Sequence, residues 1–361
     1  MVAVTRSHLH CGAVTLLLVF AWPGCGGLGK PPGPPRVDDC ASGWNVTAIS
    51  GNDTLMMPRS MTWAQGVLYE AAWSAVLAVP ADGSVQQTLV ADVYPTGIWA
   101  EGNNVLYSAG NQLLQVARTG GNATVIVDGG PVPDPSAPSG ETQAAGEPTM
   151  LDAAYFYWSS LTYDGRGTLV SRIPRVGGTA EVIAELPLVL VGGLAVVPDG
   201  VLAAGLHGNT YSAMIAPFDG GSLRVLASGF AYGSLLSVEP AGTIWRIPDS
   251  FLTYALMLSP SDGSPTRPLA TTLPDHMTWE WASPDGNGGH FLSARERFDD
   301  GTSHRSIFFL SASGSTTRLA CEPVEASGDI RGTALSPDAL YLTINRLGSG
   351  WSIVRVPIVA P

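Results

Sequence analysis

The chain has 361 residues, of which 45% are hydrophobic and 13% charged, and it contains 43 Gly and 28 Pro. This balance is too apolar for a disordered protein and too rich in turn residues for a helical one, so it favours short buried strands joined by tight turns. The formal net charge is −12, and Lys30 is the single lysine. Nucleic acid and an anionic membrane surface are therefore excluded as partners, because both are bound by clustered basic residues.

The first residues have the pattern of an export signal. Arg6 and two histidines precede an apolar run from Ala13 to Trp22, which is too short to span a bilayer. The following segment, Trp22-Pro23-Gly24-Cys25-Gly26-Gly27, resembles the lipobox of bacterial lipoproteins. The resemblance implies a signal peptide over residues 1–25, lipidation of Cys25, and export to the cell envelope with a lipid anchor as the only membrane contact. Secretion without a lipid is the alternative.

Residues 26–43 include Lys30-Pro31-Pro32-Gly33-Pro34-Pro35 and show no apolar pattern, which predicts a stiff, extended tether. Signal removal would discard Cys11 and lipidation would use Cys25, leaving Cys40 and Cys321 as an even pair. We therefore expect a disulfide between Cys40 and Cys321. Two unpaired buried thiols are the alternative.

From residue 44 onward, one unit recurs along the chain: an apolar strand, a Pro-x-x-Gly segment, and a second strand. Four copies are clear, two are degenerate, and one is cut short: Val79–Gly83, Ile173–Gly177, Ala216–Gly220, Ser259–Gly263, Val116–Gly120, Leu310–Gly314 and Val356-Pro357. Successive copies are separated by 37 to 57 residues. This spacing matches the period of a four-stranded propeller blade, which is about 40 to 50 residues. Two longer intervals each contain an insertion, at Pro131 to Pro148 and at Arg295 to His304.

Each copy has the chemistry of a tight turn. The Asp-Gly pairs supply the positive φ that a short hairpin needs, so Asp82, Asp219 and Asp262 are interpreted as turn residues and not as metal ligands. An aromatic or apolar strand lies upstream of most turns, as in Val67-Leu68-Tyr69 and Tyr155-Phe156-Tyr157-Trp158. Each unit is therefore expected to contain four strands.

The repeat predicts an all-β fold, a seven-bladed β-propeller of four-stranded antiparallel blades that forms a single domain over residues 44–361. The seventh unit ends too early to contain a fourth strand, so we expect Trp44 to Ser50 to supply it and close the ring. The expected blades are listed in chain order: 57–92, 95–130, 147–186, 191–229, 232–272, 275–322, and 329–361 with 44–50. Six blades are the alternative.

The third unit carries a resemblance to known families. Tyr157-Trp158-Ser159-Ser160, followed by Val170 to Gly178, resembles the Tyr-Trp-Thr-Asp propeller repeat. It is also similar to secreted bacterial propellers, often lipoproteins, with Tyr-Trp, Arg-Val-Pro and Gly-Gly in each blade. Only this unit has Tyr-Trp, and Ser159-Ser160 replaces Thr-Asp, so the role of that family's Asp does not carry over.

In propellers, the connections that lead into the innermost strands surround the axis on one face, where ligands usually bind. Both insertions should lie on that face. The residues next to these strands are chemically mixed, and the two arginines among them suit a carboxylate or a sugar, while a polar ring around channel water is the alternative. We expect the ligand-binding residues to be Arg59, Glu147, Tyr232, Asp275, His276, Asp329 and Arg331.

No His-x-x-x-His or Cys-x-x-Cys spacing, nucleophile elbow or phosphate-binding loop appears in the sequence. We therefore expect a monomeric, non-enzymatic binding module without cofactor, metal or catalytic residues, whose partner is an unknown protein, glycan or small molecule. One alternative is a metal-assisted lyase or hydrolase in which Glu147, Asp275 and His276 converge near the axis. The other is a structural scaffold with an apolar rim.

Overall fold

The structure is a computed structural model that describes residues 47–51, 59–130, 132–134, 137, 142–143, 149–231, 234–248, 254–269, 277–297, 303–323, 330–346 and 350–358. The chain divides into two units, Met1–Arg36 and Val37–Pro361, and every described residue belongs to the second. Trp44 to Val46, Cys25, Cys40 and the expected signal and tether lie outside the described residues. No α-helix occurs in the described ranges.

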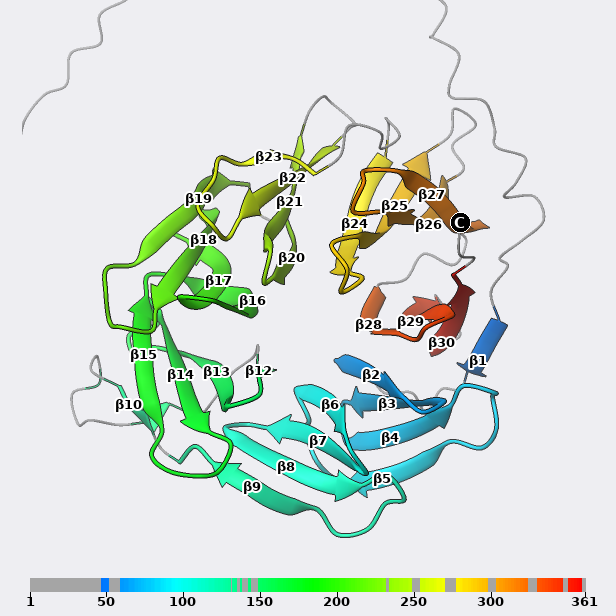
Figure 1. Ribbon diagram of the computed structural model, residues 1–361, viewed down its shortest axis with the longest axis horizontal. Helices are drawn as coiled ribbons and strands as arrows, with labels where there is room; N and C mark the ends of the chain where they lie inside the picture. The colour runs from blue at the N-terminus through cyan, green and yellow to red at the C-terminus, as the bar shows by residue number, and fades with distance from the viewer. Residues whose placement is uncertain are drawn as a thin grey trace, which may run out of the picture. The chain divides into compact units, whose positions relative to one another are not determined.

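Seven four-stranded antiparallel sheets form a ring in the second unit, which confirms the seven-bladed propeller and rules out six blades (Figure 1). In each blade the first strand lies nearest the axis and the fourth lies at the rim. Blades 1 to 3 consist of β2 (Ser60–Ala64), β3 (Val67–Ala72), β4 (Ala75–Pro80) and β5 (Gln87–Ala91); β6 (Gly97–Glu101), β7 (Asn104–Ala109), β8 (Gln112–Ala117) and β9 (Thr124–Asp128); and β12 (Thr149–Leu151), β13 (Tyr155–Leu161), β14 (Thr168–Pro174) and β15 (Glu181–Leu186).

The other four blades follow the same order from axis to rim. They consist of β16 (Val189–Val197), β17 (Gly200–His207), β18 (Thr210–Pro217) and β19 (Arg224–Phe230); β20 (Leu235–Glu239), β21 (Gly242–Pro248), β22 (Tyr254–Pro260) and β23 (Arg267–Pro268); β24 (Met277–Pro284), β25 (His290–Arg297), β26 (Ser303–Leu310) and β27 (Thr316–Pro323); and β28 (Ile330–Leu335), β29 (Ala339–Arg346), β30 (Gly350–Pro357) and β1 (Thr47–Gly51). A separate hairpin of β10 (Val132–Pro133) and β11 (Thr142–Gln143) lies between blades 2 and 3.

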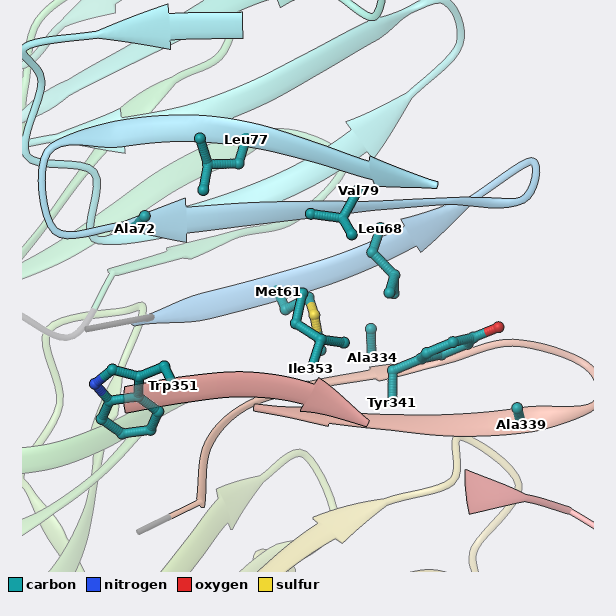
Figure 2. Close-up of a cluster of buried hydrophobic side chains, with 10 residues drawn as sticks. All are labelled: Met61, Leu68, Ala72, Leu77, Val79, Ala334, Ala339, Tyr341, Trp351 and Ile353. Atoms are coloured by element: carbon teal, nitrogen blue, oxygen red, sulfur yellow. The ribbon is translucent and has the colours of Figure 1, made fainter. Parts of the chain in front are cut away.

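The ring closes by strand exchange between the two ends of the domain. β1 pairs antiparallel with β30, placing Thr47 opposite Arg355, so the described part of the expected closing segment is the outer strand of blade 7. At this seam, Met61, Leu68 and Val79 of blade 1 pack against Tyr341 and Ile353 of blade 7 (Figure 2). Closure therefore pairs an edge strand and buries an apolar sheet face at the same time.

Apolar packing between blades holds the ring together. The described residues form seven buried clusters, and each cluster combines side chains of two neighbouring blades. In the third blade, Trp158 packs toward blade 2 while Tyr157 packs toward blade 4. The Tyr-Trp pair thus has a core role, because neighbouring residues of a strand point to opposite faces of its sheet.

The turns between third and fourth strands follow the sequence expectation, including the degenerate copies. In six blades the last residue of the Pro-x-x-Gly segment is a glycine with a positive φ, which ranges from +74° at Gly220 to +88° at Gly177. Its N–H donates to the carbonyl three residues earlier at 2.9 to 3.3 Å. The carboxylates of Asp82, Asp219 and Asp262 each accept the N–H two residues later, at 2.8 to 2.9 Å. These aspartates stabilise turns.

One expected insertion has a different structure. Residues from Arg295 to His304 were expected to form an extended connection, but Arg295 to Arg297 end β25, and Ser303 and His304 begin β26. The described residues of this insertion lengthen two paired strands, in which Arg295 lies directly opposite Arg305. The charged side chains of Arg295, Glu296 and Arg305 therefore project from paired strands and not from a loop.

Candidate functional site

Strand alternation separates the connections of the ring onto two faces. Chain segments between blades and turns between second and third strands emerge on one face, which we call the mouth face, and the remaining turns emerge on the other. Arg59 and Arg331, two of the expected ligand-binding residues, are described and lie at the beginnings of the inner strands β2 and β28, on the mouth face. The other expected residues lie outside the described ranges: Glu147, Tyr232, Asp275, His276 and Asp329.

Arg59 contributes to an exposed aromatic cluster on the mouth face. Its backbone N–H donates to the Ala71 carbonyl at 2.9 Å. Its guanidinium carbon lies 4.7 Å from the centroid of the Trp73 ring, which is a cation–π distance. Trp73 and Tyr94 form an edge-to-face pair with centroids 6.2 Å apart, and their exposed fractions are 42% and 62%. Arg59 is thus next to aromatic surface instead of in a cavity with Arg331.

Arg331 borders a cavity of about 430 Å³ on the mouth face, formed by blades 5, 6 and 7. Three of its six described lining residues are arginines. We call it the arginine cavity, and it is lined by Arg246, Glu280, Trp281, Arg305, Ile330 and Arg331. No histidine or cysteine is among these described residues, and the lining comes from strands β21, β24, β26 and β28.

Glu280 is at the centre of the polar contacts around the arginine cavity. Its Oε1 lies 2.8 Å from an Nη2 of Arg295, and its Oε2 accepts from Nε of Arg305 at 2.8 Å. From blade 5, Nη1 of Arg246 donates to the carbonyl of Trp279 at 2.7 Å. The bond from Arg246 joins blade 5 to blade 6 at the cavity, while the two contacts of Glu280 lie within blade 6. Such charge-assisted hydrogen bonds are shorter and stronger than neutral ones.

A β-bulge positions Glu280. The register of β24 against β25 shifts between Trp279 and Trp281, so Glu280 is an extra residue on the bulged strand. Trp279 consequently packs toward blade 5 while Trp281 packs toward blade 7, although strict alternation would place both on one face. The neighbouring inner strand β28 has a register shift between Ile330 and Thr333, which includes Arg331. Irregular backbone thus occurs in two adjacent strands that line the cavity.

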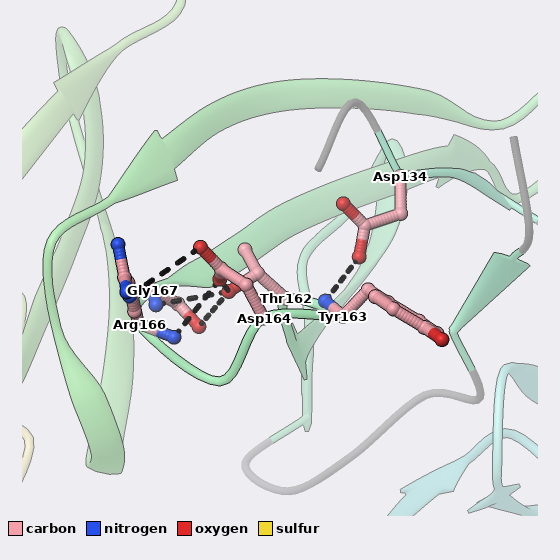
Figure 3. A network of polar contacts seen from close by, with 6 residues as sticks. All are labelled: Asp134, Thr162, Tyr163, Asp164, Arg166 and Gly167. Atoms are coloured by element: carbon pink, nitrogen blue, oxygen red, sulfur yellow. Dashed lines mark hydrogen bonds and ion pairs between the residues drawn. The ribbon is translucent and has the colours of Figure 1, made fainter. Parts of the chain in front are cut away.

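The insertion between blades 2 and 3 is attached to the mouth face. Asp134, 1% exposed, accepts a hydrogen bond from the backbone N–H of Tyr163 at 2.6 Å (Figure 3). Tyr163 belongs to the turn between β13 and β14, in which the Thr162 hydroxyl and Asp164 form further bonds. The described part of this insertion is therefore attached through Asp134 to a turn of the mouth face, as expected.

The opposite face carries a larger cavity at the seam between blades 1 and 7. It has a volume of about 590 Å³, and its lining includes Trp63, Tyr341, Asp338 and Arg355. Here Nη2 of Arg355 lies 2.5 Å from a carboxylate oxygen of Asp338. The hydrogen bond from the Ser336 hydroxyl lowers the pKa of Asp338 most, and the contact with Arg355 lowers it further. At this cavity Arg355 is paired with Asp338, and Asp82 is a second carboxylate of the lining, whereas the arginine cavity has an excess of cations among its described residues.

No group of three His, Cys, Asp or Glu side chains that could hold a metal ion occurs in the parts of the chain that the structure describes. Glu147, Asp275 and His276 fall outside those parts, so the metal-assisted alternative stays a hypothesis. Within the described ranges, no helix has the length and apolar character needed to cross a membrane.

Cys321 lies in β27, the outer strand of blade 6, and it is disulfide-bonded. The residue with which it pairs lies outside the described ranges. Pairing of Cys321 with Cys40 therefore stays a prediction.

Sequence reasoning missed Arg246, Glu280 and Arg305. Each lies inside an apolar strand, and a charged residue within such a strand, as in Trp279-Glu280-Trp281, was the available signal. A charged group is rarely buried unless it is paired, so its presence there indicates a partner on another strand.

No protein-family model and no curated protein sequence matches the chain. Among solved structures, an oligogalacturonate lyase in complex with manganese superposes with a TM-score of 0.60 at 10% identity, covering 87% of this chain and 93% of that chain. YCF48 from Cyanidioschyzon merolae superposes with a TM-score of 0.52 at 9% identity, covering 86% and 98% of the two chains. At these identities the similarity shows the fold alone.

Proposed function

We propose that this chain is an exported propeller, tethered to the cell envelope, that binds a ligand at its mouth face without transforming it. The observation that carries the proposal is the arginine cavity, where both oxygens of Glu280 accept from arginines. Arginine does not release its proton at physiological pH, and Glu280 is the one acidic side chain among the described lining residues. This chemistry suits recognition of a ligand better than proton transfer to or from it.

Export is supported by the N-terminal sequence pattern and by the disulfide at Cys321. Disulfides persist in oxidising compartments and are rare in the cytosol, where thiols are kept reduced. The resemblance to secreted bacterial propellers with Tyr-Trp and Arg-Val-Pro repeats agrees with this location. The tether that follows Cys25 would then hold the domain away from the lipid surface.

Fractionation of cells that express the full chain tests export and lipidation. We expect the wild-type protein in the membrane fraction, released by detergent, and a Cys25→Ser variant in the soluble exported fraction, because only the thiolate of Cys25 can carry the lipid. A His8→Ala variant, which changes the signal but leaves the lipobox intact, is the control and should fractionate like the wild type. Retention of wild-type protein in the cytoplasm would contradict export.

Ligand binding is tested by thermal shift of the purified chain against glycans and metabolites. We expect a ligand that raises Tm in the wild type and in an Arg355→Gln variant of the opposite face, but less in Arg331→Gln. The competing metal-assisted hypothesis predicts turnover instead. Product formation that is abolished by a chelator and by His276→Ala would replace binding with catalysis as the function.

A further inference from the structure

We propose that the arginine cavity is a site for a small carboxylate-bearing molecule, held by Arg305 and Arg331 against the Trp281 side chain. The inference rests on the proposed function, since it names the ligand class of the mouth face. It goes beyond the sequence expectation, which included Arg331 but none of the other residues that line this cavity.

The charge of the cavity favours an anion. Its described lining contains three guanidinium groups and one carboxylate, and Arg295 adds a fourth cation that contacts the same carboxylate. The whole chain has a net charge of −12, so this concentration of cations is opposite to the protein's overall sign. Such a local excess attracts anionic ligands because the low-dielectric walls of a cavity strengthen charge interactions.

Arg305 supplies the strongest indication of a ligand. Only 4% of this residue is exposed, and its Nε is used by Glu280. Its Nη1 is buried and has no hydrogen-bond partner among the described residues, and the same holds for Nε of Arg295. A buried, unsatisfied donor on a charged group is costly, so a small shift of the Arg305 side chain that brings Nη1 to a bound acceptor would recover a charge-assisted hydrogen bond.

The geometry of the groups selects a carboxylate. A guanidinium presents donors in a planar fork that matches the two oxygens of a carboxylate. Glu280, in the cavity wall, already binds two guanidinium groups, one through each of its oxygens. Trp281 contributes an aromatic wall suited to the carbon skeleton of the ligand. A volume of about 430 Å³ is within the range of small-molecule pockets.

Isothermal titration of the full chain with citrate is the test, with trimethyl citrate as the uncharged probe of similar shape. We expect citrate to bind and trimethyl citrate not to bind. Arg331→Gln should weaken citrate binding by about tenfold, because one charge-assisted contact is lost. Arg331 is exposed, so this variant should fold. Arg355→Gln, which removes an arginine on the opposite face, should leave citrate affinity unchanged.

Glu280→Gln should change citrate affinity in the direction opposite to that of Arg331→Gln. Removing the competing carboxylate should strengthen citrate binding by about tenfold, while the ligand-free protein should melt at a lower temperature because Arg295 and Arg305 lose their anionic partner. A purely structural role for this arginine cluster predicts the loss of stability without the gain in affinity, and that result would overturn the proposal.

Inorganic phosphate separates carboxylate recognition from general attraction of anions. Citrate binding should persist in the presence of equimolar phosphate, and equal competition by phosphate would overturn the carboxylate assignment. Absence of citrate binding, or equal binding by wild type and Arg331→Gln, would also overturn it. A neutral glycan that binds the mouth face when citrate does not would refute this inference and leave the proposed function standing.

Discussion

Glu70 is a buried carboxylic acid in the second strand of blade 1. None of the residue is exposed, and neither carboxylate oxygen has a hydrogen-bond partner among the described residues. Removal from water disfavours the charged form and raises the pKa of Glu70 to about 8. The folded protein therefore holds Glu70 protonated at neutral pH, although an unfolded chain would release that proton.

This difference predicts that stability falls as pH rises. The contribution of Glu70 is fully present below about pH 4.5, decreases as pH rises, and is lost above about pH 8, with a total of roughly 5 kcal/mol as an upper limit. Glu70→Gln, which cannot ionise, should raise the free energy of unfolding at pH 9 and change it little at pH 5. Urea unfolding at both pH values measures this.

The control is Glu185→Gln, since Glu185 is an exposed glutamate on the outer strand β15. Its substitution should leave the pH dependence of stability unchanged. If the wild type and Glu70→Gln show the same dependence between pH 5 and pH 9, the proton on Glu70 is not the cause.

At the scale of the element, the turn after the third strand depends on glycine. Gly177 has a φ of +88°, and a Cβ built there would meet no atom within 4 Å. Gly177→Ala should therefore lower the free energy of unfolding by about 1 kcal/mol through backbone strain alone. Gly177→Asn should cost less, because asparagine tolerates the left-handed region better than alanine.

Chemical unfolding of the three proteins measures this ranking. Equal stability of Gly177→Ala and wild type would show that the turn can rearrange to a negative φ. An asparagine variant less stable than the alanine variant would contradict the conformational explanation.

These turns could be predicted from the sequence and the bulge in β24 could not. A Pro-x-x-Gly turn is determined by the φ preferences of its own residues, so even the degenerate copies ending at Gly120 and Gly314 fold as expected. The bulge at Glu280 depends on how β24 aligns with β25, a contact between strands. Alternation in Trp279-Glu280-Trp281 predicts both tryptophans on one face, and packing against two different blades overrides that pattern.

At the scale of the whole molecule, the seam between blades 7 and 1 should control cooperative unfolding. Deleting β1 removes the strand paired with β30 and uncovers the packing of Ile49 against the seam cluster. We expect a lower Tm and aggregation, because an edge strand and apolar surface become exposed together. Scanning calorimetry and light scattering measure both effects.

Deletion of the hairpin between blades 2 and 3, residues 132–143, is the matched control. Among the described strands this hairpin pairs only with itself, and Asp134 ties it to the turn at Tyr163, so its loss should leave the ring closed and lower Tm much less than the loss of β1. A β1 deletion that melts like the hairpin deletion would show that closure contributes little to stability.

The disulfide of Cys321 gives a further prediction at this scale. Peptide mapping without reduction should recover a peptide of β27 linked to one that contains Cys40, as expected from the cysteine count. The same digest after reduction is the control and should release both peptides. Linkage of Cys321 to Cys11 or Cys25 would contradict the expected processing of the N-terminus.

Blade number and ring closure could be predicted from the sequence. The spacing of the repeat gives the number of blades, and the short last copy shows that one strand must come from elsewhere in the chain. The candidate site was accessible only in part. Arg331 was found from its place before an inner strand, but the arginine cavity combines residues of three blades, and which side chains meet depends on blade packing and strand register.

The pairing of β1 with β30 also determines when the first strand can form its native contacts during synthesis. Thr47 is made first and meets Arg355 only after about 300 further residues have been synthesised, so loop closure makes this a late and slow contact. Until then β1 lacks its native partner strand. If the chain is exported, β1 also crosses the membrane before β30 is available to pair with it. Chaperones that shield nascent chains would therefore be expected to act longest on the beginning of this protein.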